Sequence, residues 1–220
     1  MGLKIYGVLR SRASRTVWLA KELGLAFEHI PVIQAYRLAD AAAADAPLNT
    51  ASPAFRTVNP NGHIPTIDDD GLILHESLAI NLYLAKKHGG PLAPRDVGED
   101  GAMAMWALWA ATECEAQALN ILYHRAGLPP AERKPEIAEA AVAALRQPCH
   151  VLEAALQTGE GYLVGRRFTV ADLNTAEVMR YAQAAPELFA AHPALQRWLA
   201  ACQDRPAFKA MMAARNAEPA

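Results

Sequence analysis

The side chains with the most specific chemistry in this chain are a glutamate and a serine, Glu76 and Ser77. Leu78, Leu82 and Ala85 follow on one face of a helix, so the pair is predicted to open that helix. A helix start has free backbone N–H groups and a positive dipole end, and with a hydroxyl it can bind a carboxylate. Glu76 could hold an ammonium beside it, so the pair would suit the α-amino-acid end of a peptide. The structural alternative is that Ser77 only caps the helix and Glu76 lies in solvent.

The elements that must position this pair form a tight hairpin. Thr66 and Ile67 begin an apolar strand directly after Pro65. Asp70-Gly71 is typical of a two-residue turn with positive φ at both positions, and residues 72–74 return as the second strand. The hairpin therefore leads the chain directly into the helix that carries the candidate binding residues.

The run N-P-N-G-H-I-P at residues 59–65, followed by E-S-L-A-I at residues 76–80, resembles the glutathione-binding half of the cytosolic glutathione transferases. In that family the proline is cis, and the backbone of the residue before it pairs with the cysteinyl part of glutathione. The Glu-Ser pair grips the γ-glutamyl end. The resemblance implies that these roles fall on Ile64, Pro65, Glu76 and Ser77.

Glutathione reacts through its thiolate, and a thiol with a pKa of about 8.5 ionises more readily beside a hydroxyl donor and a helix N-terminus. The loop at residues 10–15, R-S-R-A-S-R, precedes an expected helix. Its S-x-x-S-R pattern resembles the loop of serine-type, theta- or tau-like transferases of bacterial style. There the first serine hydrogen-bonds the glutathione sulfur, which implies Ser11 as the catalytic residue and leaves Ser14 as the helix cap.

A tyrosine is the alternative partner for the thiolate. Tyr6 ends the first expected strand, where some classes of the family carry the tyrosine that serves this purpose, although a strand tyrosine can equally be part of the core. Residues 11–14 contain no cysteine, which argues against thiol-transfer chemistry by the protein itself.

A histidine precedes the Ile-Pro pair. His63 stands where the family often has lysine or glutamine, and it could meet the glycyl carboxylate of glutathione. Such a contact would strengthen as the imidazole becomes charged near pH 6.5. The alternative is a solvated loop side chain.

Length and composition point to a globular protein of one large or two small domains. The chain has 220 residues and a formal charge of −2, which gives no reason to expect nucleic acid or a membrane surface. Neither a signal peptide nor a long apolar run is recognised, and Cys114, Cys149 and Cys202 form no metal or CxxC pattern. We expect reduced, buried cysteines, no metal and a cytoplasmic protein.

The order of elements changes near residue 89. Residues 1–88 predict an α/β, thioredoxin-like domain with strands at 3–8 and 27–32, an irregular stretch at 34–58 containing an alanine-rich helical turn, and the hairpin. A Gly/Pro-rich linker at 89–97 leads to an all-α domain at 98–220. Thr169 and Asp172 form a capping box with a structural role, similar to one in the family. Helices are predicted at about 98–126, 132–157, 169–184, 193–203 and 206–215.

The resemblance implies a glutathione transferase that acts in detoxification, a homodimer with glutathione as substrate and a small hydrophobic electrophile as second substrate. The alternatives are a glutathione-dependent isomerase, peroxidase or dehalogenase on the same site, or a non-catalytic binding protein. In the family the first long helix borders the electrophile site, although most large side chains on such a helix are core. The candidates there are Trp106, Trp109, Glu113 and Tyr123.

Overall fold

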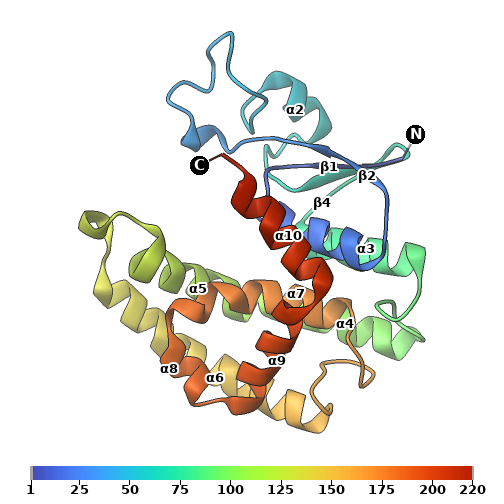
Figure 1. Cartoon of the computed structure of the whole chain (residues 1–220), viewed down its shortest axis with the longest axis vertical. Coiled ribbons are helices and arrows are strands. Elements are labelled where there is room, and N and C mark those ends of the chain that lie inside the picture. The colour runs from blue at the N-terminus through green and yellow to red at the C-terminus, as the bar shows by residue number, and fades with distance from the viewer. Residues whose placement is uncertain (1, 220) are drawn as a thin grey trace. The chain divides into compact units, whose positions relative to one another are not determined.

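The computed structural model describes residues 2–219 of the chain. These residues form two compact units (Figure 1). The first contains residues 2–88 together with residues 206–219, and the second contains residues 89–205.

A four-stranded sheet forms the centre of the first unit. Its strands are β1 (Leu3–Tyr6), β2 (Phe27–Ile30), β3 (Thr66–Asp69) and β4 (Leu72–His75), in the order β2-β1-β3-β4. Strand β1 is parallel to β2 and antiparallel to β3, and β3 is antiparallel to β4. Asp70 and Gly71 both have positive φ, 53° and 95°, so the predicted hairpin turn is confirmed.

Helices cover both faces of the sheet (Figure 1). Helices α1 (Ala13–Glu22) and α3 (Ser77–His88) pack together on one face, and α2 (Pro53–Val58) covers the other, where Phe55 contacts the ring of Tyr6. The short 3-10 helix η1 spans Ala35–Arg37. The sequence predicted residues 34–58 as irregular and missed α2, because six residues are too few to show a helical period. The alanine-rich stretch forms turns instead of the expected helical turn.

Helix α10 (Pro206–Ala217) belongs to the first unit, although it follows the helical segment in sequence. Its Phe208 ring packs edge-on against Trp18 of α1, with the centroids 4.9 Å apart. Trp18 is fully buried, so this contact joins α10 to the core of the sheet unit. The sequence grouped this helix with the all-α part because local periodicity does not reveal the partner of an amphipathic face.

The second unit is built from helices joined by loops. A continuous run contains α4 (Val97–Trp109), the π turn η2 (Ala110–Cys114), α5 (Glu115–Leu122) and the π turn η3 (Tyr123–Gly127), and it agrees with the helix predicted at 98–126. The other predicted helices are also present, whereas the short α8 and η4 were not predicted. The remaining elements are η4 (Pro130–Glu132), α6 (Pro135–Thr158), α7 (Val170–Met179), η5 (Arg180–Ala184), α8 (Pro186–Ala190) and α9 (Pro193–Asp204).

The predicted capping box opens α7. The backbone N–H of Thr169 donates to a carboxylate oxygen of Asp172 at 2.9 Å, and the Thr169 hydroxyl accepts from the N–H of Ala171 at 3.3 Å. The second carboxylate oxygen accepts from the indole of Trp198 and the N–H of Leu163. Asp172 is fully buried and engaged on both oxygens, which supports the structural role that the sequence assigned to it.

The three cysteines are buried and free, as predicted. Burial raises the pKa of the Cys149 thiol to about 12, so this side chain behaves as a small apolar group.

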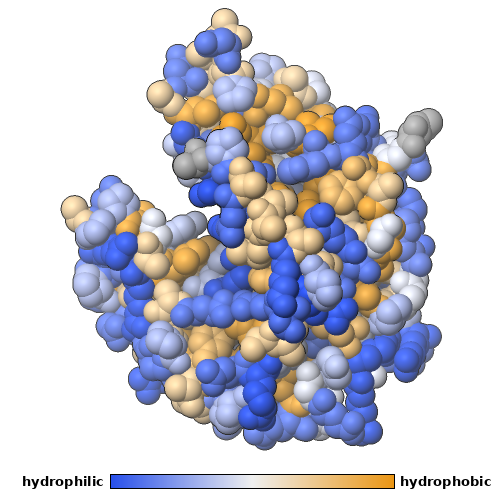
Figure 2. Space-filling view, viewed as in Figure 1, coloured by the Kyte–Doolittle hydropathy of each residue, from blue (hydrophilic) through white to orange (hydrophobic). Residues whose placement is uncertain are grey.

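Within residues 2–219, no helix combines the length and apolar character that a membrane crossing requires, and no cluster of potential ligands is arranged to hold a metal ion. Figure 2 shows hydrophilic side chains over much of the visible face of the helical unit.

Candidate active site

The sheet register brings three segments of the first unit to one edge. Tyr6 at the end of β1 pairs with Thr66 at the start of β3, and Thr66 pairs with His75 at the end of β4. The chain therefore leaves β1, enters β3 and leaves β4 at the same edge of the sheet. The predicted site residues lie in the segments adjoining these three positions: Ser11, His63, Ile64, Pro65, Glu76 and Ser77.

Gly7 lets the first two of these segments approach each other. Its φ is 132°, and a Cβ on it would lie 3.0 Å from the Cβ atoms of both Ala13 and Ile64. Few side chains tolerate that spacing or that φ. The loop after β1 and the segment before β3 are thus in direct contact through a position without a side chain.

The Ser11 hydroxyl is held inside its own loop. Its Oγ donates to the carbonyl of Val8 at 2.6 Å and accepts from the N–H of Ala13, the first residue of α1, at 3.0 Å. Ser11 therefore satisfies a free N–H of the helix start, which the sequence expected of Ser14. That expectation was wrong, because Ser14 lies inside α1 and is fully buried.

Ser11 is half-exposed, so the residue has surface accessible to solvent. A hydroxyl has one proton, so Ser11 would turn that proton from Val8 to donate to a thiolate, while the bond from Ala13 could keep its oxygen in place. The N-terminal end of α1 adds a positive dipole.

The loop before β3 carries the peptide bond Ile64-Pro65 in the cis form, as the resemblance implied. Pro65 is buried, whereas Ile64 is half-exposed. Among the described residues, neither the N–H nor the carbonyl of Ile64 takes part in a hydrogen bond. Main-chain groups of this kind can pair with an extended peptide in the manner of an added strand.

An asparagine that the sequence analysis did not single out supports this loop. The side-chain amide of Asn59 donates to the carbonyl of His63 and to the hydroxyl of Thr66, each at 2.9 Å. Gly62 has a φ of 62°, and a Cβ there would lie 2.6 Å from the carbonyl oxygen of Thr50. In the N-P-x-G run, Asn59 therefore stabilises the loop by hydrogen bonds, and Gly62 occupies a position with no room for a side chain.

Ser77 is the first residue of α3, as predicted, and is only 5% exposed. Its hydroxyl accepts a hydrogen bond of 3.1 Å from Nη1 of Arg15 on α1. Glu76 is exposed and has a φ of 72°, in the left-handed region. For a residue other than glycine this conformation costs about 1–3 kcal/mol, and such residues cluster at ligand sites.

The other two candidates of this unit differ in their surroundings. The His63 side chain is exposed, while its carbonyl accepts from Asn59 and Thr66. Tyr6 is half-buried, with its ring centroid 6.2 Å from that of Phe55 on α2. The packing of Tyr6 corresponds to the core alternative of the sequence analysis.

The four electrophile-site candidates lie on the α4–η3 run of the second unit. Trp106 is only 7% exposed and meets Trp109 edge-on, with the centroids 5.1 Å apart. Glu113 and Tyr123 are exposed and belong to the two π turns, which often occur at functional sites. Trp106 is thus mainly a core residue, whereas the other three have accessible surface.

Comparison with known proteins identifies both halves of the chain. Residues 11–87 match the glutathione S-transferase N-terminal domain, and residues 115–206 match the glutathione S-transferase C-terminal domain. Glutathione S-transferase 3 of Zea mays is 30% identical over 96% of this chain and 94% of its own length.

Solved structures agree with this assignment. The glutathione-bound theta class glutathione S-transferase of Xanthomonas axonopodis pv. citri is 29% identical, with a TM-score of 0.75 over 95% of this chain and 96% of its own. Glutathione S-transferase I from maize, solved with an atrazine glutathione conjugate, is 25% identical, with a TM-score of 0.83 over 100% of both chains. With both domains in order and a 30% identical relative over nearly its whole length, the chain belongs to the glutathione S-transferase family.

Proposed function

We propose that this protein joins the thiolate of glutathione to a small hydrophobic electrophile by substitution or conjugate addition. The observation that carries the proposal is the arrangement at one edge of the sheet. The Ser11 hydroxyl at the start of α1, the unpaired main chain of Ile64 and the Ser77 hydroxyl at the start of α3 lie in the three segments that adjoin this edge. Family membership and the conjugate bound to the maize relative support the same activity.

Each part of the edge suits one part of glutathione. The γ-glutamyl carboxylate meets the Ser77 hydroxyl and the N-terminal end of α3, and its ammonium meets the carboxylate of Glu76. The cysteinyl unit pairs with the main chain of Ile64, beside Pro65. His63 is exposed and able to meet the glycyl carboxylate.

The proposed chemistry is stabilisation of the thiolate. Ser11 donates its proton to the sulfur in a hydrogen bond, and the thiol proton passes to solvent. The sulfur then forms a bond to carbon; a substitution expels the leaving group, and a conjugate addition ends with protonation of the adduct. A drop of about 2 units in the thiol pKa corresponds to about 2.7 kcal/mol. One hydrogen bond to a charged acceptor supplies about 1.5–3 kcal/mol, which is sufficient.

The second substrate is proposed to contact accessible side chains of the α4–η3 run. Trp109 and Tyr123 offer aromatic surface, and Glu113 offers an exposed carboxylate. Trp106 supports Trp109 from the core. The proposal also includes a homodimer, which rests on the family resemblance, and a cytoplasmic location, which rests on the reduced cysteines expected from the sequence.

The experiment that tests the proposal begins with retention on immobilised glutathione and elution by free glutathione. Turnover is then measured with a halonitroarene and with a panel of epoxides and peroxides. Failure to bind glutathione would rule out the proposed function. Turnover of peroxides without conjugation would replace it by peroxide reduction.

Variants separate the assigned roles. Ser11→Ala is expected to raise the pKa of the bound thiol and lower kcat, whereas Tyr6→Phe should leave both nearly unchanged. Ser77→Ala should instead raise the Kd for glutathione. If Ser11→Ala behaves as the parent and Tyr6→Phe loses activity, the thiolate role passes to Tyr6.

A further inference from the structure

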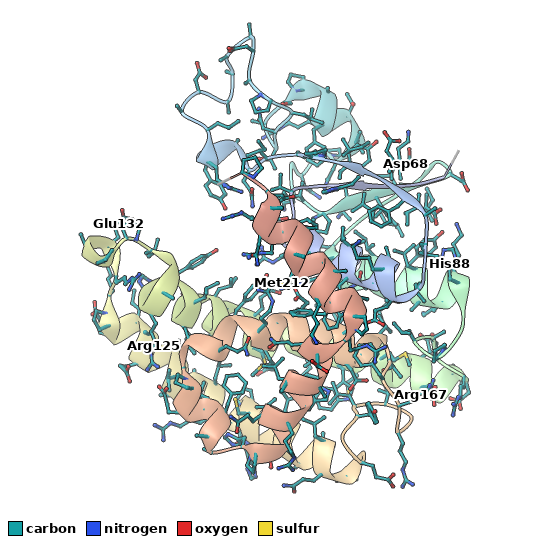
Figure 3. The ribbon with its side chains drawn as sticks, viewed as in Figure 1. Asp68, His88, Arg125, Glu132, Arg167 and Met212 are labelled. Carbon is teal, nitrogen blue, oxygen red and sulfur yellow. The ribbon has the colours of Figure 1, made fainter. Side chains whose placement is uncertain are left out.

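The segment after α10 returns to the loop that precedes Ser11. One carboxylate oxygen of Glu218, Oε1, accepts the backbone N–H of Leu9 at 2.7 Å, and Oε2 accepts that of Arg10 at 3.0 Å. Nη2 of Arg10 also donates to the Glu218 carbonyl at 3.3 Å. The contacts join residues about two hundred positions apart within one compact unit. In Figure 3, Met212 marks α10.

A single peptide group connects this carboxylate to the proposed catalytic hydroxyl. The N–H of Leu9 and the carbonyl of Val8 belong to the same planar peptide group. Glu218 holds the N–H side of that group, and the Ser11 hydroxyl donates to its carbonyl side at 2.6 Å. The second peptide group that Glu218 holds, at the N–H of Arg10, directly precedes the one that leads into Ser11.

We propose that Glu218 is a positioning residue that fixes the loop at residues 8–11 and thereby the Ser11 hydroxyl. The inference rests on the proposed role of Ser11 in the reaction. Glu218 does not touch substrate in this proposal; it acts by holding two consecutive peptide groups with charge-assisted hydrogen bonds.

The Glu218 carboxylate has two opposite effects on the Ser11 hydroxyl. Its charge polarises the Val8 carbonyl, which would hold the Ser11 proton away from the sulfur, but such polarisation changes a hydrogen bond by only about 10–30%. Its two bonds to the loop are charge-assisted, and each has roughly twice the strength of a neutral one. Positioning therefore outweighs polarisation, and loss of Glu218 should impair ionisation of the thiol.

The anchoring of α10 explains why the carboxylate reaches this loop. Phe208 in the first turn of α10 packs on the fully buried Trp18 of α1, and α1 begins directly after the loop. The helix then extends to Ala217, and Glu218 follows it. Helix α1 thus begins at the Ser11 loop and, through Trp18, also anchors α10. Glu218, just after α10, in turn holds that loop.

The test compares Glu218→Ala and Glu218→Gln with the parent and with Asn216→Ala, a control on the exposed surface of the last turn of α10. The pKa of bound glutathione is measured from thiolate absorbance, and kcat and KM with a halonitroarene. Glu218→Ala should raise the thiol pKa by about 0.5–1 unit and lower kcat/KM about 3–10-fold, since each pKa unit corresponds to a factor of ten in ionisation. Glu218→Gln keeps one acceptor oxygen and should fall between; the control should match the parent.

A double-mutant cycle with Ser11→Ala identifies the route of the effect. If Glu218 acts through Ser11, the double variant Ser11→Ala/Glu218→Ala should match Ser11→Ala in thiol pKa. Additive effects, an unchanged pKa in a folded Glu218→Ala, or a lowered pKa would overturn the inference while leaving the role of Ser11 intact. An unchanged pKa in Ser11→Ala would instead overturn the thiolate role of Ser11 on which this inference rests. If Glu218→Ala does not fold, the same double-mutant cycle is measured with Glu218→Gln and Ser11→Ala, again by the pKa of the bound thiol.

Discussion

Arg15 donates a hydrogen bond to the hydroxyl of Ser77 at 3.1 Å, and both side chains are buried. A guanidinium has no acceptor, so the Ser77 oxygen must accept, and its own proton remains available for another partner. Because the two residues lie 62 positions apart, the bond joins the first turns of α1 and α3. Ser11, proposed to bind the thiolate, lies just before α1, and Ser77, proposed to bind the γ-glutamyl carboxylate, begins α3. The hydrogen bond from Arg15 therefore links the two helix starts that carry the proposed binding residues.

We predict that Arg15→Met raises the Kd for glutathione about 5–10-fold, because loss of one hydrogen bond that orients Ser77 removes about 1–1.4 kcal/mol of binding. Titration calorimetry measures the change. Arg12→Met is the matched control, since Arg12 is exposed just before the same helix. Equal effects of the two substitutions would show that Arg15 acts only through its charge.

The loop that presents Ile64 is predicted to depend on Asn59. Asn59→Ala removes three hydrogen bonds of a fully buried amide: those donated to the carbonyl of His63 and the hydroxyl of Thr66, and the one accepted from the N–H of Asn61. We expect a loss of about 1–3 kcal/mol in the free energy of unfolding, together with weaker glutathione binding. Urea denaturation and calorimetry measure the two effects. Asn61→Ala, exposed in the same loop, should change neither; an intact affinity in Asn59→Ala would contradict the support assigned to it.

Gly7→Ala is predicted to lower activity more than its size suggests. The new methyl would lie 3.0 Å from the Cβ atoms of Ala13 and Ile64, at a φ of 132°. Relief of this contact must move the Ile64 segment away from the Ser11 loop, so kcat/KM should fall. Gly101→Ala, in the interior of α4 with open space around it, should instead be neutral or stabilise by about 0.5–1 kcal/mol. Unchanged kinetics in Gly7→Ala would show that the spacing of the two segments is not critical.

Much of the fold could be predicted because its signals are local. The Asp70-Gly71 turn, the start of α3 at Ser77 and the capping box of Thr169 and Asp172 each need only a few neighbouring residues. The long helices were visible as extended apolar periods. Helix α2 was missed because it spans six residues only.

The supporting contacts of the site could not be predicted in the same way. Arg15 and Ser77 are 62 positions apart, and Glu218 and Leu9 are 209 apart, so nothing in either local pattern points to the other. Ser11 and Ser14 both fit a cap by type, and only the backbone path showed that the helix begins at Ala13. The residues proposed to touch glutathione could be read from a motif, while the residues that hold them depend on packing.

In the second unit, an arginine joins α4 to the start of the helical segment (Arg167 in Figure 3). Its Nη1 and Nη2 donate to the two carboxylate oxygens of Glu99 at 2.8 and 2.6 Å, and Nε and Nη2 also donate to the carbonyls of Pro91 and Ala93. The hydrogen bonds from Arg167 hold the pKa of Glu99 at about 2, against the opposing effect of burial. The pair therefore anchors the Gly/Pro-rich segment that the sequence identified as a linker.

This pair makes stability depend on pH in a defined window. The pKa of Glu99 is lowered on folding from 4.5 to about 2, so its contribution is complete above pH 4.5 and is lost as the pH falls towards 2. Glu99→Gln should lower the free energy of unfolding by about 1.5–3 kcal/mol at pH 7, and the difference from the parent should shrink between pH 4.5 and pH 2. Urea denaturation over this range measures it, with the exposed Glu132→Gln as control. A difference that stays constant with pH would contradict the ionic character of the pair, because a purely steric defect has no proton linkage.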